Sequence, residues 1–328
     1  MGNNRMYMGS LILNIIIFAI ALYLLFLASD WLIHSSVKMA MLLRLSPLFI
    51  GLIFIAFGTS APEAAVGIIA SIENQGDIAL GDIVGSSIAN IGLVLGIAAL
   101  IKPIKIDPKI FRREVPLVVF AAIVLFIFCM DLEISRIEGL LFLLCFIIFC
   151  VFAYNDPYYK QESKEELKDF KPRKFIEKLN SKRVVSLAFF AALLFVVLAT
   201  NIMINSGVEI AKYFKISPWI IGLTLFAIGT SIPELAITWT AVMKKVPSIS
   251  VGNIIGSDIF NILFVLGIAA LIRPITINPD VLIFELPIML VFILALALFM
   301  STGHILKRIE GAILLSAYVL FIIILFLR

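Results

Sequence analysis

Long apolar runs separated by short polar stretches dominate the pattern of this chain. Each run has roughly 17 to 25 residues, the length that a helix needs to cross the hydrocarbon core of a bilayer, about 30 Å thick. We therefore predict ten membrane-spanning helices. They cover residues 11–29, 48–71, 82–101, 115–130, 137–154, 184–205, 219–243, 253–272, 282–300 and 309–327.

The composition agrees with this pattern and excludes a water-soluble domain. Hydrophobic residues make up 62% of the chain and charged residues 15%, and the mean hydropathy is +1.12. Soluble domains typically contain about 45–50% apolar and about 25% charged residues. We expect an all-α integral membrane protein.

Lysine and arginine are distributed unevenly between the two sides of the predicted membrane. If the N terminus lies outside, the inner loops hold 20 of the 26 basic residues, nine of them in the segment 155–183. Short cytoplasmic loops carry an excess of basic residues. The sequence therefore predicts a cytoplasmic (plasma) membrane protein with both termini outside and the 155–183 loop in the cytoplasm.

The chain also contains an internal repeat. SPLFIGLIFIAFGTSAPE, which ends at Glu63, matches SPWIIGLTLFAIGTSIPE, which ends at Glu234, 171 residues later. The same offset aligns GDIVGSSIANIGLVLGIAALIKPIKIDP with GNIIGSDIFNILFVLGIAALIRPITINP. Identity at this level indicates a duplication.

Each copy of the repeat holds five spans, an odd number, so the second copy must enter the membrane from the opposite side. This parity predicts a 5+5 inverted-topology repeat with broken helices at mid-membrane, an architecture typical of secondary transporters. The predicted divisions are a first repeat at 1–154, a cytoplasmic linker at 155–183 and a second repeat at 184–328.

The second span of each repeat is interrupted by GTSAPE or GTSIPE. Pro62 and Pro233 cannot donate a backbone hydrogen bond, so each opens the helical ladder. Glu63 and Glu234 follow directly, and an ionised carboxylate at this depth costs several kcal/mol unless it is paired or coordinates an ion. We predict that a cation binds between the two carboxylates.

The predicted donors are all oxygen atoms. The hydroxyls of Thr59 and Thr230 and the freed main-chain carbonyls lie beside the two glutamates in sequence. Ca²⁺ takes about six to eight oxygen ligands, whereas Zn²⁺ prefers His or Cys. The motifs contain neither residue type, which favours a hard cation.

The third span of each repeat carries GSSIAN or GSDIFN. Ser86 and Asn90, like Ser257 and Asn261, are four residues apart and share a helix face. A single pair of this kind is typical of hydrogen bonding between membrane helices. Because two copies occur in register with the two glutamates, we assign these side chains to secondary coordination positions.

Two acidic residues break the symmetry of the repeat. Asp82 aligns with Asn253, and Asp258 aligns with Ser87. We consider both aspartates candidates for the path by which ions reach the site, with the capping of a half-helix as the alternative.

At these motifs the chain resembles the cation/Ca²⁺ exchanger superfamily, and the paired motifs look like its sodium/calcium exchanger branch. The resemblance covers nearly the whole chain. It implies a secondary active antiporter that exchanges Na⁺ for Ca²⁺ by alternating access, in a ten-helix inverted repeat. It also implies that Na⁺ and Ca²⁺ are the transported substrates and that the protein is surrounded by membrane lipid. We expect no cofactor, no enzymatic activity, no bound nucleic acid and no obligatory protein partner.

The resemblance further implies a role for each position of the motifs. Thr59, Glu63, Thr230 and Glu234 would bind a central Ca²⁺ and compete with Na⁺. The sodium sites would be completed by Ser60, Ser86, Ser231 and Ser257 and by the carbonyls of Ala56 and Ala227, with Asn90 and Asn261 in the middle.

One departure bears on the coupling ion. Some microbial and potassium-dependent members place an Asp where this chain has Asn261, so K⁺ co-transport is disfavoured unless Asp258 substitutes. Proton-coupled members usually have Asn where this chain has Thr59. A H⁺- or K⁺-coupled exchanger is the nearest alternative function, a cation channel is a second, and an intramembrane enzyme is a distant third.

Overall fold

The computed structural model describes residues 2–106, 108–157, 176, 179, 181–214, 229 and 231–327. Most of them are helical, so the expected all-α class is confirmed. Among the described residues, eight helical segments are long and apolar enough to cross a membrane, and one bent pair makes a ninth span. The expected span at 219–243 is described only in its second part, so the total of ten stays a prediction.

The first half of the chain begins with an unusually long helix. α1 (Gly2–Leu43) has 42 residues, or about 63 Å at 1.5 Å per residue, which is about twice the hydrocarbon thickness. The elements that follow are α2 (Pro47–Phe49), η1 (Ile50–Ile55), α3 (Ala56–Thr59), α4 (Ala61–Ile72), α5 (Gly76–Ala89), η2 (Asn90–Leu95), α6 (Gly96–Ile101), β1 (Ile104–Lys105), α7 (Pro108–Phe128), η3 (Cys129–Asp131), β2 (Glu133–Ile134) and α8 (Arg136–Asn155).

The second half repeats this order over the described residues. Its elements are α11 (Lys182–Tyr213), α14 (Ile232–Met243), α15 (Pro247–Ile259), η5 (Phe260–Val265), α16 (Leu266–Ile272), β3 (Ile275–Thr276), η6 (Val281–Glu285), α17 (Leu286–Ser301), β4 (Ile305–Leu306) and α18 (Arg308–Leu327). The segments η1, η2, η5 and η6 are π-helical. Such turns are rare and often occur at functional sites.

The second span is broken at the predicted position. α3 ends at Thr59, α4 begins at Ala61, and the two arms are bent by 46°. Pro62 occupies the first turn of α4, where its missing N–H costs least, and Ser60 between the arms leaves the helical region with ψ at 12°. Ser231, with ψ at 3°, precedes α14 in the same way.

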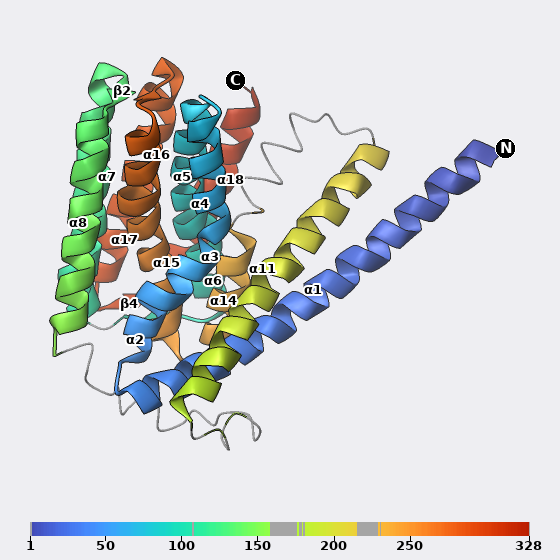
Figure 1. Ribbon diagram of the computed structural model, residues 1–328, viewed down its shortest axis with the longest axis horizontal. Helices are drawn as coiled ribbons and strands as arrows, with labels where there is room; N and C mark the ends of the chain where they lie inside the picture. Colours follow the sequence, from blue (N-terminus) through green and yellow to red (C-terminus); the bar gives the residue numbers. More distant parts are fainter. Residues whose placement is uncertain are drawn as a thin grey trace.

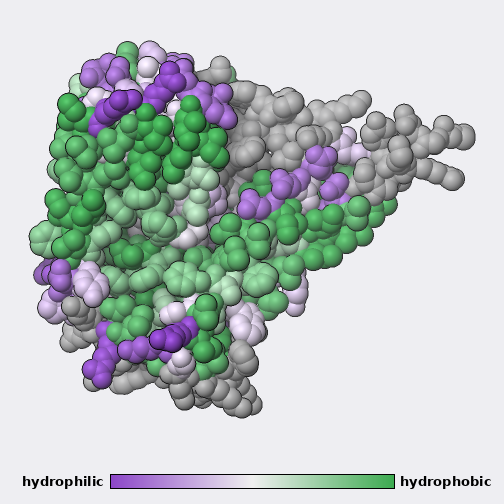
Figure 2. All heavy atoms as spheres, in the orientation of Figure 1, coloured by the Kyte–Doolittle hydropathy of each residue, from purple (hydrophilic) through white to green (hydrophobic). Residues whose placement is uncertain are grey.

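The two third spans form the centre of the molecule. In the most apolar stretch of each span, 78% of the residues are buried in Ile78–Ile101 and 83% in Pro247–Ile272. In the six other long spans among the described residues, this share is at most 39%. On the outside, Figure 2 shows a belt of hydrophobic residues bounded at both ends by hydrophilic ones. Polar residues on the two central helices are therefore shielded from lipid.

α1 and α11 pack against each other along their length and run obliquely across the rest of the helices (Figure 1). Their inner faces share a hydrophobic cluster with Ile50 and Ile55 of η1 and with Ile237 and Ala241 of α14. A second cluster contains the interiors of α5, α7, α15 and α17. The α1–α11 pair is thus a packing unit beside a larger helical body.

Close packing joins the first broken span to the second half of the chain. A Cβ atom placed on Gly256 of α15 would lie 2.2 Å from the carbonyl oxygen of Leu52 in η1. Only glycine permits this approach, as is typical of interfaces between membrane helices. The glycine therefore brings α15 and its polar side chains directly against η1.

Two short antiparallel sheets connect the halves. β1 pairs with β4, and β2 pairs with β3. Within the repeat, β1 corresponds to β3 at the offset of 171 residues, and β2 corresponds to β4 at an offset of 172. The labels of β2 and β4 lie at opposite ends of the molecule in Figure 1, so equivalent pairings occur at both ends.

Candidate functional site

The break in the second span presents a row of buried polar groups. Thr59 ends α3, Ser60 connects the arms and Glu63 lies in the first turn of α4. Their exposed fractions are 0%, 0% and 1%. The amino end of a helix carries a partial positive charge, which stabilises the carboxylate of Glu63 at this position.

The second repeat offers a matching carboxylate. Glu234 is fully buried in the first turn of α14. Its Oε1 accepts hydrogen bonds from Ser60 Oγ at 3.3 Å and from Ser257 Oγ at 3.5 Å. One serine comes from each repeat, so the two halves of the chain meet at this oxygen.

Two further contacts connect the halves. Thr59 Oγ1 donates to Asn253 Oδ1 at 3.2 Å and lies 3.3 Å from the carbonyl oxygen of Ala56. Asn90 Nδ2 donates to Asp258 Oδ1 at 3.1 Å. The broken span of the first repeat and both third spans therefore form one buried polar cluster.

Several buried polar atoms of these elements and of the start of α14 have no hydrogen-bond partner among the described residues. They are Ser87 Oγ, Asn90 Oδ1, Ser231 Oγ, Glu234 Oε2, Asn253 Nδ2 and both polar atoms of Asn261. A buried polar group left unsatisfied costs about 1–3 kcal/mol. Most of these atoms are oxygens, so the cluster suits a cation better than an anion.

The composition of the cluster indicates which cations it can hold. No group of three or more His, Cys, Asp and Glu side chains arranged for a metal occurs in the described parts of the chain. Hydroxyl, amide and carbonyl oxygens with a few carboxylates suit alkali and alkaline-earth ions, whereas transition metals prefer nitrogen and sulfur.

The residues expected from the sequence are buried where they are described, and Ser60 and Ser257 contact Glu234 directly. The buried ones are Ala56, Thr59, Ser60, Glu63, Ser86, Asn90, Ser231, Glu234, Ser257 and Asn261. Ala227 and Thr230 lie outside the described residues. Asp82 is half-buried, whereas Asp258 is 1% exposed and bonded to Asn90, so Asp258 lies within the cluster itself.

Comparison with known proteins shows where this arrangement recurs. A family model described as "Sodium/calcium exchanger protein" matches residues 13–155 and 184–327. The sodium/calcium exchanger MaX1 of Methanosarcina acetivorans is 33% identical over 345 residues, covering 95% of this chain and 98% of that protein. The inner membrane protein YrbG of Escherichia coli is 35% identical over 263 residues, covering 79% and 80%.

A solved structure agrees with these relatives. The sodium-calcium exchanger NCX_Mj, soaked with 10 mM Na⁺ and zero Ca²⁺, superimposes with a TM-score of 0.81 at 28% identity, covering 95% of this chain and 99% of that one. The chain belongs to the sodium/calcium exchanger family. This exchanger is therefore an integral membrane transporter and not an enzyme, and its family transports Na⁺ and Ca²⁺ without a cofactor.

The structure of this exchanger adds polar residues that the sequence did not single out. Asn253, the partner of Thr59, was noted only as the residue aligned with Asp82. Asp30 on α1 pairs with Lys244 at the end of α14, with 2.6 Å between Oδ1 and Nζ. A polar residue inside an apolar run was the available signal for Asn253, whereas nothing in the sequence linked Asp30 to Lys244.

Proposed function

We propose that this exchanger moves Na⁺ and Ca²⁺ in opposite directions across a plasma membrane through the polar cluster around Glu63 and Glu234. Glu63, Glu234, Thr59 and Thr230 bind Ca²⁺, and Na⁺ ions occupy the same and neighbouring positions. The flanking ligands are Ser60, Ser86, Asn90, Ser231, Ser257, Asn261 and the carbonyls of Ala56 and Ala227.

One contact supports this function most directly. Glu234 Oε1 accepts hydrogen bonds from Ser60 and Ser257, one serine from each repeat. A carboxylate that accepts hydrogen bonds from both halves and is buried at 0% exposure supports an ion site here, because such transporters typically bind their ions between the two repeats. Glu63, three residues after Ser60 and 1% exposed, adds the second carboxylate.

Exchange follows from the electrostatics of such a site. Two buried carboxylates without cations carry a charge that is costly to move through a medium of low dielectric constant. Only loaded forms interconvert readily, so Ca²⁺ neutralises the site in one direction and several Na⁺ ions do so in the other. Transport is then an obligatory exchange and not a leak.

We also propose ten spans in a 5+5 inverted repeat, with repeats at 1–154 and 184–328 and a cytoplasmic linker at 155–183. The pairing of β1 with β4 and of β2 with β3 supports the inversion, because repeat-equivalent strands pair at opposite ends of the molecule. The excess of basic residues in the inner loops supports placing both termini outside.

Alternating access in this arrangement requires one unit to move against the other. The α1–α11 pair shares an apolar contact surface with η1 and α14. Apolar contacts are non-directional, so this surface tolerates sliding better than a hydrogen-bonded one. We propose that α1 and α11 slide across the body that holds the site and expose it to each side in turn.

Flux in reconstituted vesicles tests this function. Purified protein in proteoliposomes takes up ⁴⁵Ca²⁺ when an outward Na⁺ gradient is imposed, and Glu63→Gln and Glu234→Gln abolish the uptake. Glu73→Gln, at an exposed glutamate after α4, is the matched control and retains it. Wild-type uptake by both site variants would contradict the assignment of the site.

Asp258 favours a second candidate, a K⁺- or H⁺-coupled exchanger. Its carboxylate contacts Asn90 inside the cluster, so it supplies the charge that Asn261 lacks. Presenting Na⁺, K⁺ and H⁺ gradients one at a time distinguishes the two functions. Uptake driven by K⁺ or H⁺ alone, with none driven by Na⁺, would replace the sodium proposal.

A further inference from the structure

A pocket of about 440 Å³ opens between α7 and α8. The two helices are consecutive, but α7 packs against α17 whereas α8 packs against α16. The buried side chain of Leu263 in η5 closes the bottom of the gap between them. Binding pockets for small molecules typically have about 300–1,000 Å³, so this space is large enough for part of a lipid.

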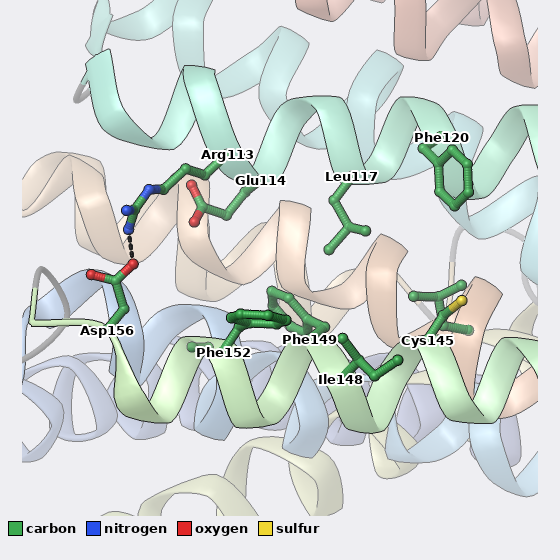
Figure 3. A pocket seen from close by; sticks show the side chains of 11 residues that line it. Arg113, Glu114, Leu117, Phe120, Cys145, Ile148, Phe149, Phe152 and Asp156 are labelled. Atoms are coloured by element: carbon green, nitrogen blue, oxygen red, sulfur yellow. Dashed lines mark hydrogen bonds and ion pairs between the residues drawn. The ribbon is translucent and has the colours of Figure 1, made fainter.

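One end of the pocket is polar and charged. Arg113 on α7 forms an ion pair with Asp156, the residue after α8 (Figure 3). The carboxylate of Glu114 also points into the gap in Figure 3, and this residue is only 2% exposed. The pocket is thus lined by one guanidinium and two carboxylates, and no other charged residue lines it among the described ones.

This charged end lies at the level of the lipid headgroups. The membrane-crossing part of α7 starts at Ile110, three residues before Arg113, and that of α8 ends at Asn155, one residue before Asp156. Charged side chains are tolerated at this depth because they reach the interface. The remainder of the pocket extends from there into the hydrocarbon region.

The rest of the lining is apolar and open to the surroundings of the protein. It consists of Leu117, Phe120, Cys145, Ile148, Phe149, Phe152 and Ala153, with Leu263 at the bottom. Phe120, Ile148 and Phe152 are 55%, 53% and 72% exposed. From Cys145 to Asp156 the lining extends about 16 Å along α8 at 1.5 Å per residue, which suits an extended hydrocarbon chain.

We propose that this pocket binds a phospholipid with a primary ammonium in its headgroup, namely a phosphatidylethanolamine. One acyl chain lies along the apolar lining, and Arg113 donates hydrogen bonds to the phosphate, for which its planar fork is well suited. Glu114 and Asp156 accept hydrogen bonds from the ammonium group. This site lies outside the ion cluster, so its occupancy does not depend on the cargo.

The charge balance selects this headgroup over the alternatives. One cation and two anions give the lining itself a formal charge of −1, so these side chains do not favour a headgroup with net negative charge. A choline headgroup is zwitterionic but has no N–H to donate to the carboxylates. The ethanolamine headgroup provides both the charge separation and the donors.

The second repeat provides a natural comparison. Glu285 occupies the position equivalent to Glu114, and both are followed two residues later by proline. Phe284 stands where the first repeat has Arg113, so the guanidinium is missing, and Glu285 does not line this pocket. Glu285→Gln is therefore a control that makes the same chemical change in an equivalent helix.

Lipid binding to the full chain tests the proposal. Delipidated protein in mild detergent is titrated with dioleoyl phosphatidylethanolamine, its N-methylated and N,N-dimethylated forms, dioleoyl phosphatidylcholine and dioleoyl phosphatidylglycerol, and bound lipid is counted by native mass spectrometry. We expect one saturable site that prefers the ethanolamine lipid to the choline lipid about tenfold, the value of one charged hydrogen bond. Equal binding of these two lipids, or preference for the glycerol lipid, would overturn the proposal.

Variants locate the site on the protein. Glu114→Gln reduces the preference for ethanolamine over choline, Glu285→Gln leaves it unchanged, and Ile148→Trp fills the apolar part and weakens all the lipids together. An unchanged preference in Glu114→Gln, or unchanged binding in Ile148→Trp, would contradict this location. If Glu114→Gln does not fold, the wild-type lipid series and Ile148→Trp still decide.

Discussion

If α1 and α11 slide as proposed, the ion pair between Asp30 and Lys244 affects how easily they move. It joins the C-terminal third of α1 to the residue after α14, the helix that carries Glu234. The oxygen–nitrogen distance is 2.6 Å, and the side chains are 14% and 38% exposed. His34 lies 3.6 Å from the same carboxylate oxygen. The pair therefore stabilises the conformation seen here against any state in which α1 has shifted.

The size of this effect follows from the exposure of the two partners. Exposed ion pairs contribute about 0.2–1 kcal/mol, and the low exposure of Asp30 places this pair near the upper end of that range. Lys244→Met keeps an unbranched side chain, shorter by one atom, and removes the charge. We expect it to shift the equilibrium between the two conformations by about 1 kcal/mol, or about fivefold.

Distance measurements between spin labels test this shift. Cysteines replace Tyr23 on α1 and Tyr154 on α8, which are 69% and 65% exposed, in a chain whose three native cysteines are replaced by alanine. Pulsed electron paramagnetic resonance then gives the distribution of distances between the two spin labels. In Lys244→Met we expect a change in the ratio of two populations: molecules with the label distance of the present conformation, and molecules with the distance of the shifted one. This ratio falls by about fivefold.

Matched variants separate the ion pair from a general effect of charge. Lys245, the next residue, is exposed and forms no ion pair among the described residues, so Lys245→Met leaves the populations unchanged. Asp30→Asn has the same effect as Lys244→Met, and the double variant adds nothing further. Identical populations in the wild type and Lys244→Met, or full additivity in the double variant, would refute the role of this pair.

Two further predictions concern the packing and the charge of the ion site. Gly256→Ala destabilises the protein by about 1–3 kcal/mol, because the new Cβ would lie 2.2 Å from the carbonyl oxygen of Leu52. We expect a lower midpoint of thermal unfolding in detergent, and an unchanged midpoint would contradict this prediction. Asp258→Asn retains an oxygen that accepts from Asn90, so the fold is preserved while one negative charge is lost. We expect fewer cations moved per Ca²⁺, measured as a change in reversal potential, and a wild-type value would exclude Asp258 from the ion site.

Much of the fold and of the candidate site could be predicted because membrane burial makes the relevant signals strong. A carboxylate and a proline inside an apolar run are costly, so Glu63 and Glu234 stood out, and the bend between α3 and α4 occurs at the expected residue. The duplication placed Ser60 and Ser257 near the same centre, and both contact Glu234. These predictions depended on local patterns that a single chain displays.

Other features depend on partners that are distant in sequence. The first span was predicted to end at residue 29, but α1 continues to Leu43, and Asp30 within it pairs with Lys244 of the second repeat. The contact between Asn253 and Thr59 required the close approach of α15 to η1. The π-helical turn at Asn90 has no sequence signature. The contacts of Asp30 and Asn253 join residues far apart in the chain, which a local pattern does not reveal.

The distribution of polar contacts supports the proposed division into a rigid ion site and a sliding α1–α11 pair. Around Glu234 the hydrogen bonds are directional and connect elements of both repeats, so displacing α15 from η1 would break contacts and expose buried oxygens. The surface beneath the α1–α11 pair consists mainly of aliphatic side chains such as Ile50, Ile55 and Ile237. One apolar contact can replace another at little cost in free energy, because such contacts are non-directional. The ion pair at Asp30 is a directional exception at this surface, so in the proposed sliding movement it would stabilise one position and be broken in the other.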